Sequence, residues 1–358
     1  MSIDLLLQSI KHDWPARQLV LDGENLSGLR LHNGVILRCS FRGCSFVGAD
    51  LSDLILQGCD LTGASFDEAT LAKCTFVECL APATHWRKAT FKQVTLMASD
   101  LSRADFSAAQ LTQTTMMRCN LGEASLREAV LQQSAIMECQ IVRLVLEAAT
   151  LQNSAITKAD LRTASLDQLR CDTIMFSDCD LSERDLTGLM LARANLSGAK
   201  LDRAKMSGVD LSGGIFAGAS LLGTDLSRAT LPGALFAKAD LRGANLRGAN
   251  LSQCIFVDAR ADSGDFSNAR LEMSVFTRAS AKAASFRGAD MPYALLHHAK
   301  VDGSDFSGAR FLRTDFHCAT TEGSLFVGHS GSSLETEPQR AVGELYDPAH
   351  VKSWNEAR

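Results

Sequence analysis

The sequence predicts an all-β fold, a four-sided solenoid, and two periodicities carry this prediction. Apolar residues recur every five positions: of the 62 positions from Leu21 to Phe326 whose number ends in 1 or 6, 57 hold Leu, Ile, Val, Phe, Met or Trp. A second period of twenty residues appears within this series, and it predicts four sides per coil. Its clearest members are Phe216, Phe236, Phe256 and Phe276, and Phe266, Phe286, Phe306 and Phe326. One phase kept over some three hundred residues indicates a repeat architecture.

The five-residue spacing also predicts how each repeat bends. A small residue usually stands two positions before each apolar centre, and residues two apart on a strand share one face. Both should therefore point inward, and the next such pair comes three residues later. Because steps of two and three alternate, the chain must bend once in every repeat. Each repeat is then one short side of a coil, and 62 sides make about fifteen coils.

The consensus itself resembles a known family. It reads A-(D/N)-L-x-x, and it stands at Ala49-Asp50-Leu51, Ala159-Asp160-Leu161, Ala194-Asn195-Leu196 and Ala289-Asp290-Met291. Over roughly residues 19–328 the chain resembles the pentapeptide repeat proteins. The resemblance implies a right-handed quadrilateral β-helix in which the apolar and the small residue point inward. It implies little about function, because the family is diverse.

The two ends of the chain depart from the repeat. Residues 1–18 are expected to form an N-terminal helical cap, with an amphipathic helix over Ser2–Ile10 that places Leu5, Leu6 and Ile10 on one side. Residues 329–358 form a polar C-terminal tail, which we expect to be mobile over His329–Arg340. Beyond it, a short docking segment is expected, comprising Leu345, Tyr346, Val351 and Trp354.

The solenoid, residues 19–328, has two irregular stretches. In residues 79–90, Pro82 removes a backbone donor, but Trp86 keeps the column of Phe46, Phe66 and Phe106, so we expect the coil to continue. In residues 169–189, Arg184 occupies a small-residue position, and burying a charge without a partner is costly. We expect a local bulge or bend there.

Composition narrows the functional classes. The charged fraction is 22% and the formal net charge is −5, so there is no basic excess to bind phosphates. No apolar run approaches the ~20 residues that span a bilayer, and the first residues lack the pattern of a signal peptide. The sequence predicts a protein without membrane or nucleic-acid partners.

The eleven cysteines are interpreted as packing residues. Nine of them occupy the small inward position, where they replace alanine: Cys39, Cys44, Cys59, Cys74, Cys79, Cys119, Cys139, Cys179 and Cys254. Thiols stacked about one strand spacing apart are liable to oxidation, which favours a reducing cytoplasm.

One side of the predicted coil, here called the fourth face, has its centres at Ile36, Leu56, Phe76 and every twentieth residue beyond. Its outward positions beside the centres are unusually apolar: Val35, Ile55, Met97, Met117, Met137, Met175, Ile215, Leu235, Ile255, Val275 and Leu295. An apolar stripe of this kind predicts a protein-binding surface, for a second copy of the chain or for a different protein. Two alternatives remain, coverage by the chain's own ends and a wrong assignment of side-chain direction.

Sequence signatures of catalysis or cofactor binding are missing, so the chain is expected not to be an enzyme and to need no cofactor. His297, His298, His317 and Cys318 fall at neighbouring sites on the fourth face. His297 and His317 are candidate ligands for zinc or nickel, although a surface histidine stack without metal is the interpretation we favour.

Three functions follow from these observations. The first is a non-catalytic protein-binding scaffold or adaptor, and the resemblance associates such bacterial proteins with type VI secretion. The second is a DNA-mimicking modulator of topoisomerases such as gyrase, as in some relatives. It requires a continuous carboxylate face, whereas here acidic residues alternate with Arg and Lys. The third is a metal-binding or enzymatic role at the cluster of His297 and His317.

Overall fold

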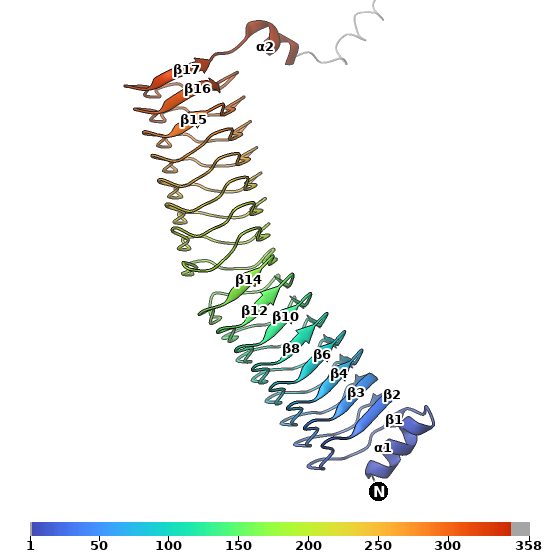
Figure 1. The fold of residues 1–358 in the computed structure, drawn as a ribbon. Helices are drawn as coiled ribbons and strands as arrows, with labels where there is room; N and C mark the ends of the chain where they lie inside the picture. Colours follow the sequence, from blue (N-terminus) through green and yellow to red (C-terminus); the bar gives the residue numbers. More distant parts are fainter. Residues whose placement is uncertain (1, 345–358) are drawn as a thin grey trace, which may run out of the picture. The chain divides into compact units, whose positions relative to one another are not determined.

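The computed structural model describes residues 2–344, which form two compact units. The first unit comprises Met1–Ala204 with Val209–Phe216, and the second comprises Lys205–Gly208 with Ala217–Arg358. Each unit is a stack of parallel β-solenoid coils (Figure 1). The docking segment expected at Leu345, Tyr346, Val351 and Trp354 lies outside the described residues.

The first unit has strands on two of its four sides. β2 (Arg30–Leu37) pairs in parallel with β3 (Asp50–Gln57), and Leu31 faces Leu51 across the ladder. The side with its centres at Leu31 and Leu51, here called the third face, continues in β4 (Thr70–Ala72), β6 (Thr90–Lys92), β8 (Gln110–Thr112), β10 (Val130–Gln132), β12 (Thr150–Gln152) and β14 (Arg170–Asp172). The fourth face continues in β5 (Thr75–Val77), β7 (Thr95–Met97), β9 (Thr115–Met117), β11 (Ala135–Met137) and β13 (Ala155–Thr157). All partners are twenty residues apart, which confirms the predicted coil.

The second unit keeps the same twenty-residue register with less extended backbone, except in its last rung, where the pairing slips by one residue after Leu312. Most of its sides pair through single bridges, such as Leu235 with Ile255. Longer strands appear near its end, where β15 (Asp290–Pro292), β16 (Arg310–Asp315) and β17 (Ser330–Leu334) form a three-stranded sheet.

The interior is built from stacked identical side chains. In the second unit the rings of Phe236, Phe256 and Phe276 stack at 4.9 and 4.5 Å between successive centroids. In the first unit Trp86 is fully buried in the column of Phe66 and Phe106. The coil therefore continues through Pro82 as predicted. The cysteines at small inward positions are buried.

Helix α1 (Ser2–Lys11) lies at the first coil of the first unit (Figure 1). Leu6 is fully buried, and Ile10 approaches Gly34 so closely that a Cβ there would lie 3.0 Å from Ile10 Cγ1. Leu5 does not share this face, since it is 53% exposed. β1 (Ala16–Arg17) then pairs with β2.

The C-terminal end differs from the expected mobile tail over His329–Arg340. β17 adds one more rung to the ladder by pairing with β16, and α2 (Pro338–Glu344) follows it. This rung was missed because β17, with the sequence SGSSL, has no apolar centre: its contribution is backbone pairing, which a hydrophobic period cannot reveal.

Around Arg184 two successive coils of the first unit separate and leave a cavity of about 520 Å³. The guanidinium donates to the carbonyl oxygens of Arg162 and Ala164, at 3.1 and 2.7 Å, instead of entering the core. Its Nε has no partner. The large polar side chain in a small-residue position therefore coincides with a local opening of the stack.

Nearly every repeat contains one residue in the left-handed region, two positions after the centre, with Thr163 as an exception, and this position was not recognised in the sequence. Gly243 holds it with φ +65°, and no atom lies within 4 Å of where its Cβ would be. Gly243→Ala should therefore test backbone strain alone. We expect it to lower the free energy of unfolding by about 1 kcal/mol in urea denaturation.

The matched control is Lys238, which holds the same position one repeat earlier with φ +60°. Lys238→Gly should change stability little, because relief of strain offsets the added freedom of the unfolded chain. Equal stability of Gly243→Ala and the wild type would contradict the strain argument.

Candidate functional site

In the second unit the apolar residues of the fourth face form one continuous column. Leu235, Ile255, Val275 and Leu295 are joined by successive bridges, each to a residue twenty positions away. Their side chains are part-exposed, and Ile255 is 39% accessible. Leu235, Ile255, Val275 and Leu295 are called the apolar column below.

In the first unit the apolar residues occupy two adjacent columns of the same face. Val35 pairs with Ile55, which is 44% exposed, in the first column. Further along it, Met175 is 41% exposed and Ile215 bridges Asn195. The second column runs through Val77, Met97, Met117 and Met137 on β5, β7, β9 and β11. The stripe is thus interrupted by polar residues in this unit.

The position just before each centre has a structural use elsewhere in the solenoid. An Asp or Asn there accepts a hydrogen bond from the backbone N–H two residues later, as Asp105 does from Ser107 at 3.0 Å. The same bond occurs on the fourth face itself. Asn195 accepts from Ser197 at 3.0 Å, and Asp315 accepts from His317 at 2.9 Å. The polar consensus residue therefore stabilises its own turn.

Five apolar residues interrupt this pattern between Asn195 and Asp315 on the fourth face: Ile215, Leu235, Ile255, Val275 and Leu295. Their side chains have no oxygen and cannot accept the turn N–H. A net contribution of about 0.5–1.5 kcal/mol per hydrogen bond is thus absent at each of these positions. The turn hydrogen bond, which favours Asp or Asn elsewhere, therefore does not explain the apolar column.

Ion pairs link successive coils beside the methionines of the first unit. Glu138 lies 2.9 Å from both Arg118 and Lys158, one coil below and one above. Lys158 and Arg118 together lower the pKa of Glu138. The alternating charges of this stretch therefore form ion pairs between successive coils of the same chain.

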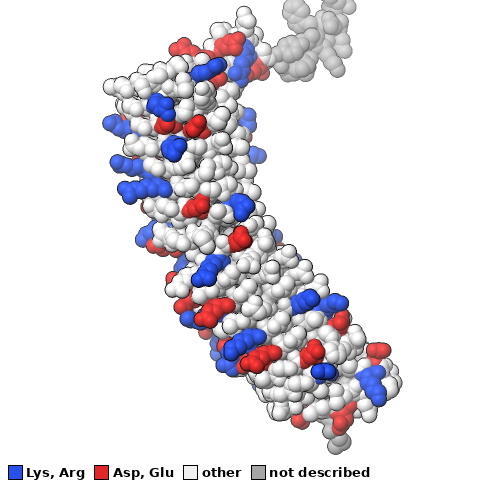
Figure 2. Space-filling view, in the orientation of Figure 1, with Lys and Arg blue, Asp and Glu red and all other residues white. Residues whose placement is uncertain are grey.

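Acidic side chains on other faces are also engaged. Asp67 pairs with Arg87 on the next coil at 2.5 Å, and Asp305 pairs with Arg287 at 2.8 Å. Figure 2 shows Asp and Glu interleaved with Lys and Arg on the visible side of each unit. A continuous carboxylate surface is not present on that side.

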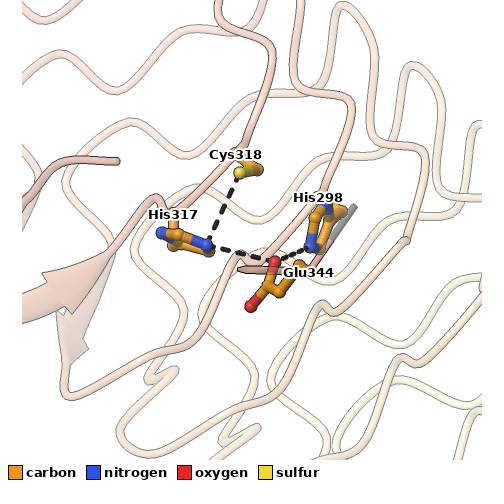
Figure 3. Close-up of side chains that lie close together, drawn as sticks. All are labelled: His298, His317, Cys318 and Glu344. Atoms are coloured by element: carbon orange, nitrogen blue, oxygen red, sulfur yellow. Dashed lines mark hydrogen bonds and ion pairs between the residues drawn. The ribbon is translucent and has the colours of Figure 1, made fainter. Parts of the chain in front are cut away.

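A second cluster lies where α2 meets the last coils of the second unit (Figure 3). Its members are His298, His317, Cys318 and Glu344, and one ligand atom from each lies within 4.8 Å of all the others. His297, a candidate from the sequence, is not a member. Its ring is held by Asp315 at 2.8 Å and by Arg340 at 3.3 Å. The group of donor atoms that the structure brings together thus contains His298 and His317, and His297 lies outside it.

The cluster could not be assembled from the repeat alone. His298, His317 and Cys318 follow from the twenty-residue register, but Glu344 arrives on a helix outside the repeat.

Among the residues described, no helix has the length and apolar character needed to cross a membrane.

Family models match most of the solenoid. A model described as a pentapeptide repeat region matches residues 35–106. A second, described as pentapeptide repeats in eight copies, matches residues 104–139, 176–213, 219–258 and 254–292. No curated protein sequence matches the chain significantly.

Solved structures with significant matches include three named proteins. QnrB1, a plasmid-mediated fluoroquinolone resistance protein, is 22% identical, covers 52% of this chain and 93% of its own, with a TM-score of 0.32. HetL from Nostoc sp. strain PCC 7120, involved in heterocyst differentiation regulation, is 28% identical over 71% of this chain and 94% of its own, with a TM-score of 0.24. A thylakoid lumen protein from Arabidopsis thaliana is 34% identical over 27% and 65%, with a TM-score of 0.22.

Proposed function

The chain belongs to the pentapeptide repeat family, and we propose that it is a non-catalytic protein-binding scaffold that docks a partner on the fourth face. The partner is a second copy of the chain or another cytoplasmic protein. The observation that carries this proposal is the apolar column of Leu235, Ile255, Val275 and Leu295, which lies in register and part-exposed.

Two physical arguments support the proposal. A row of part-exposed aliphatic side chains gains free energy when a partner covers it, at about 25 cal/mol per Å² removed from water. The same row gives up the turn hydrogen bonds that Asn195 and Asp315 make on this face. A row of residues that gives up the turn hydrogen bond and exposes apolar surface is typical of binding surfaces.

Leu235→Asp with Ile255→Asp tests the proposal without damaging the fold. Each new carboxylate can accept the turn N–H of Ala237 or Val257, so we expect unfolding stability to be kept or raised. Binding should weaken at least tenfold, because a charge would be buried at the interface. Sedimentation velocity over a range of concentrations measures self-association, and pull-down from the native host measures hetero-association.

The matched control is Thr230→Asp with Asn250→Asp. These residues hold the same repeat position five residues earlier, on the third face, and bridge each other. They should leave association unchanged. If the fourth-face and third-face variants behave alike, the apolar column is not the docking surface.

A finer proposal follows from the family resemblance, namely an adaptor in type VI-like bacterial secretion. Identification of proteins that co-purify with the tagged chain, and their loss in the Leu235→Asp, Ile255→Asp variant, tests it.

The gyrase-modulator alternative has less support, because Asp67, Glu138 and Asp305 already pair with cations on neighbouring coils. An unchanged rate of DNA supercoiling by gyrase is the expected result.

A further inference from the structure

The cluster at the C-terminal end of the second unit joins two elements that the repeat does not connect. His298 and His317 lie on successive coils, Cys318 follows His317, and Glu344 comes from the last turn of α2 (Figure 3). Glu344 Oε2 lies 2.8 Å from His298 Nε2 and 3.2 Å from His317 Nε2. Cys318 Sγ lies 3.5 Å from His317 Nε2.

These four donors match the preferences of zinc. Protein zinc sites use Cys, His and Asp or Glu in tetrahedral sets of four, with bonds of roughly 2.0–2.3 Å. Ligand atoms in such a tetrahedron lie roughly 3.3–3.8 Å apart. The three contacts in the cluster span 2.8–3.5 Å, so small shifts would centre an ion between them.

Charge and burial support the same assignment. Two neutral imidazoles, one thiolate and one carboxylate carry two negative charges, which one divalent cation neutralises. Neutrality matters because His317 is 1% exposed, and an uncompensated charge beside it would be costly. Cys318 is the one cysteine of the eleven that is not fully buried, so its sulfur is accessible to an ion.

We propose that His298, His317, Cys318 and Glu344 bind one Zn²⁺ ion, which fastens α2 to the last coils. When zinc binds, the Nε2 protons between the histidines and Glu344 leave these positions, and the Cys318 thiol releases its proton to solvent. His317 Nδ1 accepts from the backbone N–H of Glu337 at 3.3 Å. Ligation through Nε2 moves the ring proton to Nδ1 and releases this bond, so Glu337, the residue that leads into α2, shifts on metal binding.

The ion would also explain how a short helix stays on the solenoid. α2 has no buried residues among its seven, so apolar packing does not hold it. Arg340 and Glu344 provide its polar contacts to the coils, through His297 and the two cluster histidines. A metal bond from Glu344 replaces its hydrogen bonds to the two histidines with a fixed link.

The test uses the full chain, freed of metal by chelator and titrated with Co²⁺ and then Zn²⁺. We expect one ion per chain and a visible spectrum with a thiolate-to-cobalt charge-transfer band and strong tetrahedral transitions. Zn²⁺ should displace Co²⁺ and slow hydrogen exchange in residues 338–344. Absence of stoichiometric binding at about 100 μM metal, or bound cobalt without the thiolate band, would overturn the proposal.

Variants locate the ion. Cys318→Ser should abolish the thiolate band, and His298→Ala and Glu344→Gln should each weaken binding at least tenfold (about 10–100-fold is typical even of residues that merely orient ligands). His32→Ala, on β2 of the first unit and outside the cluster, is the control and should bind zinc as the wild type does. Far-UV circular dichroism of each variant reports whether the coils remain folded. Wild-type affinity in His298→Ala with Glu344→Gln would place the ion elsewhere and refute the site.

Discussion

Trp86→Ala is expected to lower the free energy of unfolding by about 3–5 kcal/mol. Trp86 is fully buried in the first unit, with its ring stacked 4.0 Å from Phe66 and 5.8 Å from Phe106 between centroids. Its Nε1 donates to Thr84 Oγ1 at 2.7 Å. Removing the indole leaves a cavity in a column of aromatic rings, and it leaves Thr84 without that donor.

The effect should be local, because each coil contacts its neighbours along the stack. Hydrogen exchange read by mass spectrometry should show the largest loss of protection in residues 66–106, and urea denaturation gives the total. Trp86→Phe is the control, since it keeps the ring stack and loses the indole N–H, and we expect about 1–2 kcal/mol. A uniform loss of protection along the whole unit would contradict the local model.

The repeat made most of the fold predictable because a residue's position in the repeat determines both its direction and its neighbours. A residue's number modulo five gives its direction, and modulo twenty gives its neighbours, as the pairing of Leu31 with Leu51 illustrates. Contacts made by segments outside the repeat were not predictable. Leu5 turned outward on α1, and β17 paired without an apolar centre, because each depends on how a terminal segment meets the coil at its own end of the chain.

The candidate sites divide in the same way. The columns through Ile255 follow from the register, so their residues could be named from sequence. The candidate metal site needed Glu344 from α2, and His298 rather than His297 belongs to it because Asp315 and Arg340 hold the ring of His297. The role of the polar residue before each centre was a missed signal, since its preference for Asp or Asn already indicated a side-chain bond to the turn.

Cysteine reactivity should differ by orders of magnitude between Cys318 and the other ten thiols. All ten are buried, while Cys318 is part-exposed. Burial raises the pKa of Cys74 to about 11 and those of Cys179 and Cys254 to about 12. The thiolate is the reactive form, so near neutral pH these thiols are both protonated and inaccessible to a reagent.

Iodoacetamide added to metal-free native protein should therefore place one adduct per chain, at Cys318, and eleven adducts after unfolding in urea. Cys318→Ser should show none in the native state.

The same pKa shifts determine how the stability of the fold depends on pH. Because the folded-state pKa of Cys254 exceeds its ordinary value of 9.0, the unfolded chain releases its proton first. Stability should fall as pH rises from about 9 toward 12, and native-state labelling should then spread to the buried thiols. Rapid labelling of Cys254 at neutral pH, with the coils intact by circular dichroism, would show that the interior opens far more often than its packing allows.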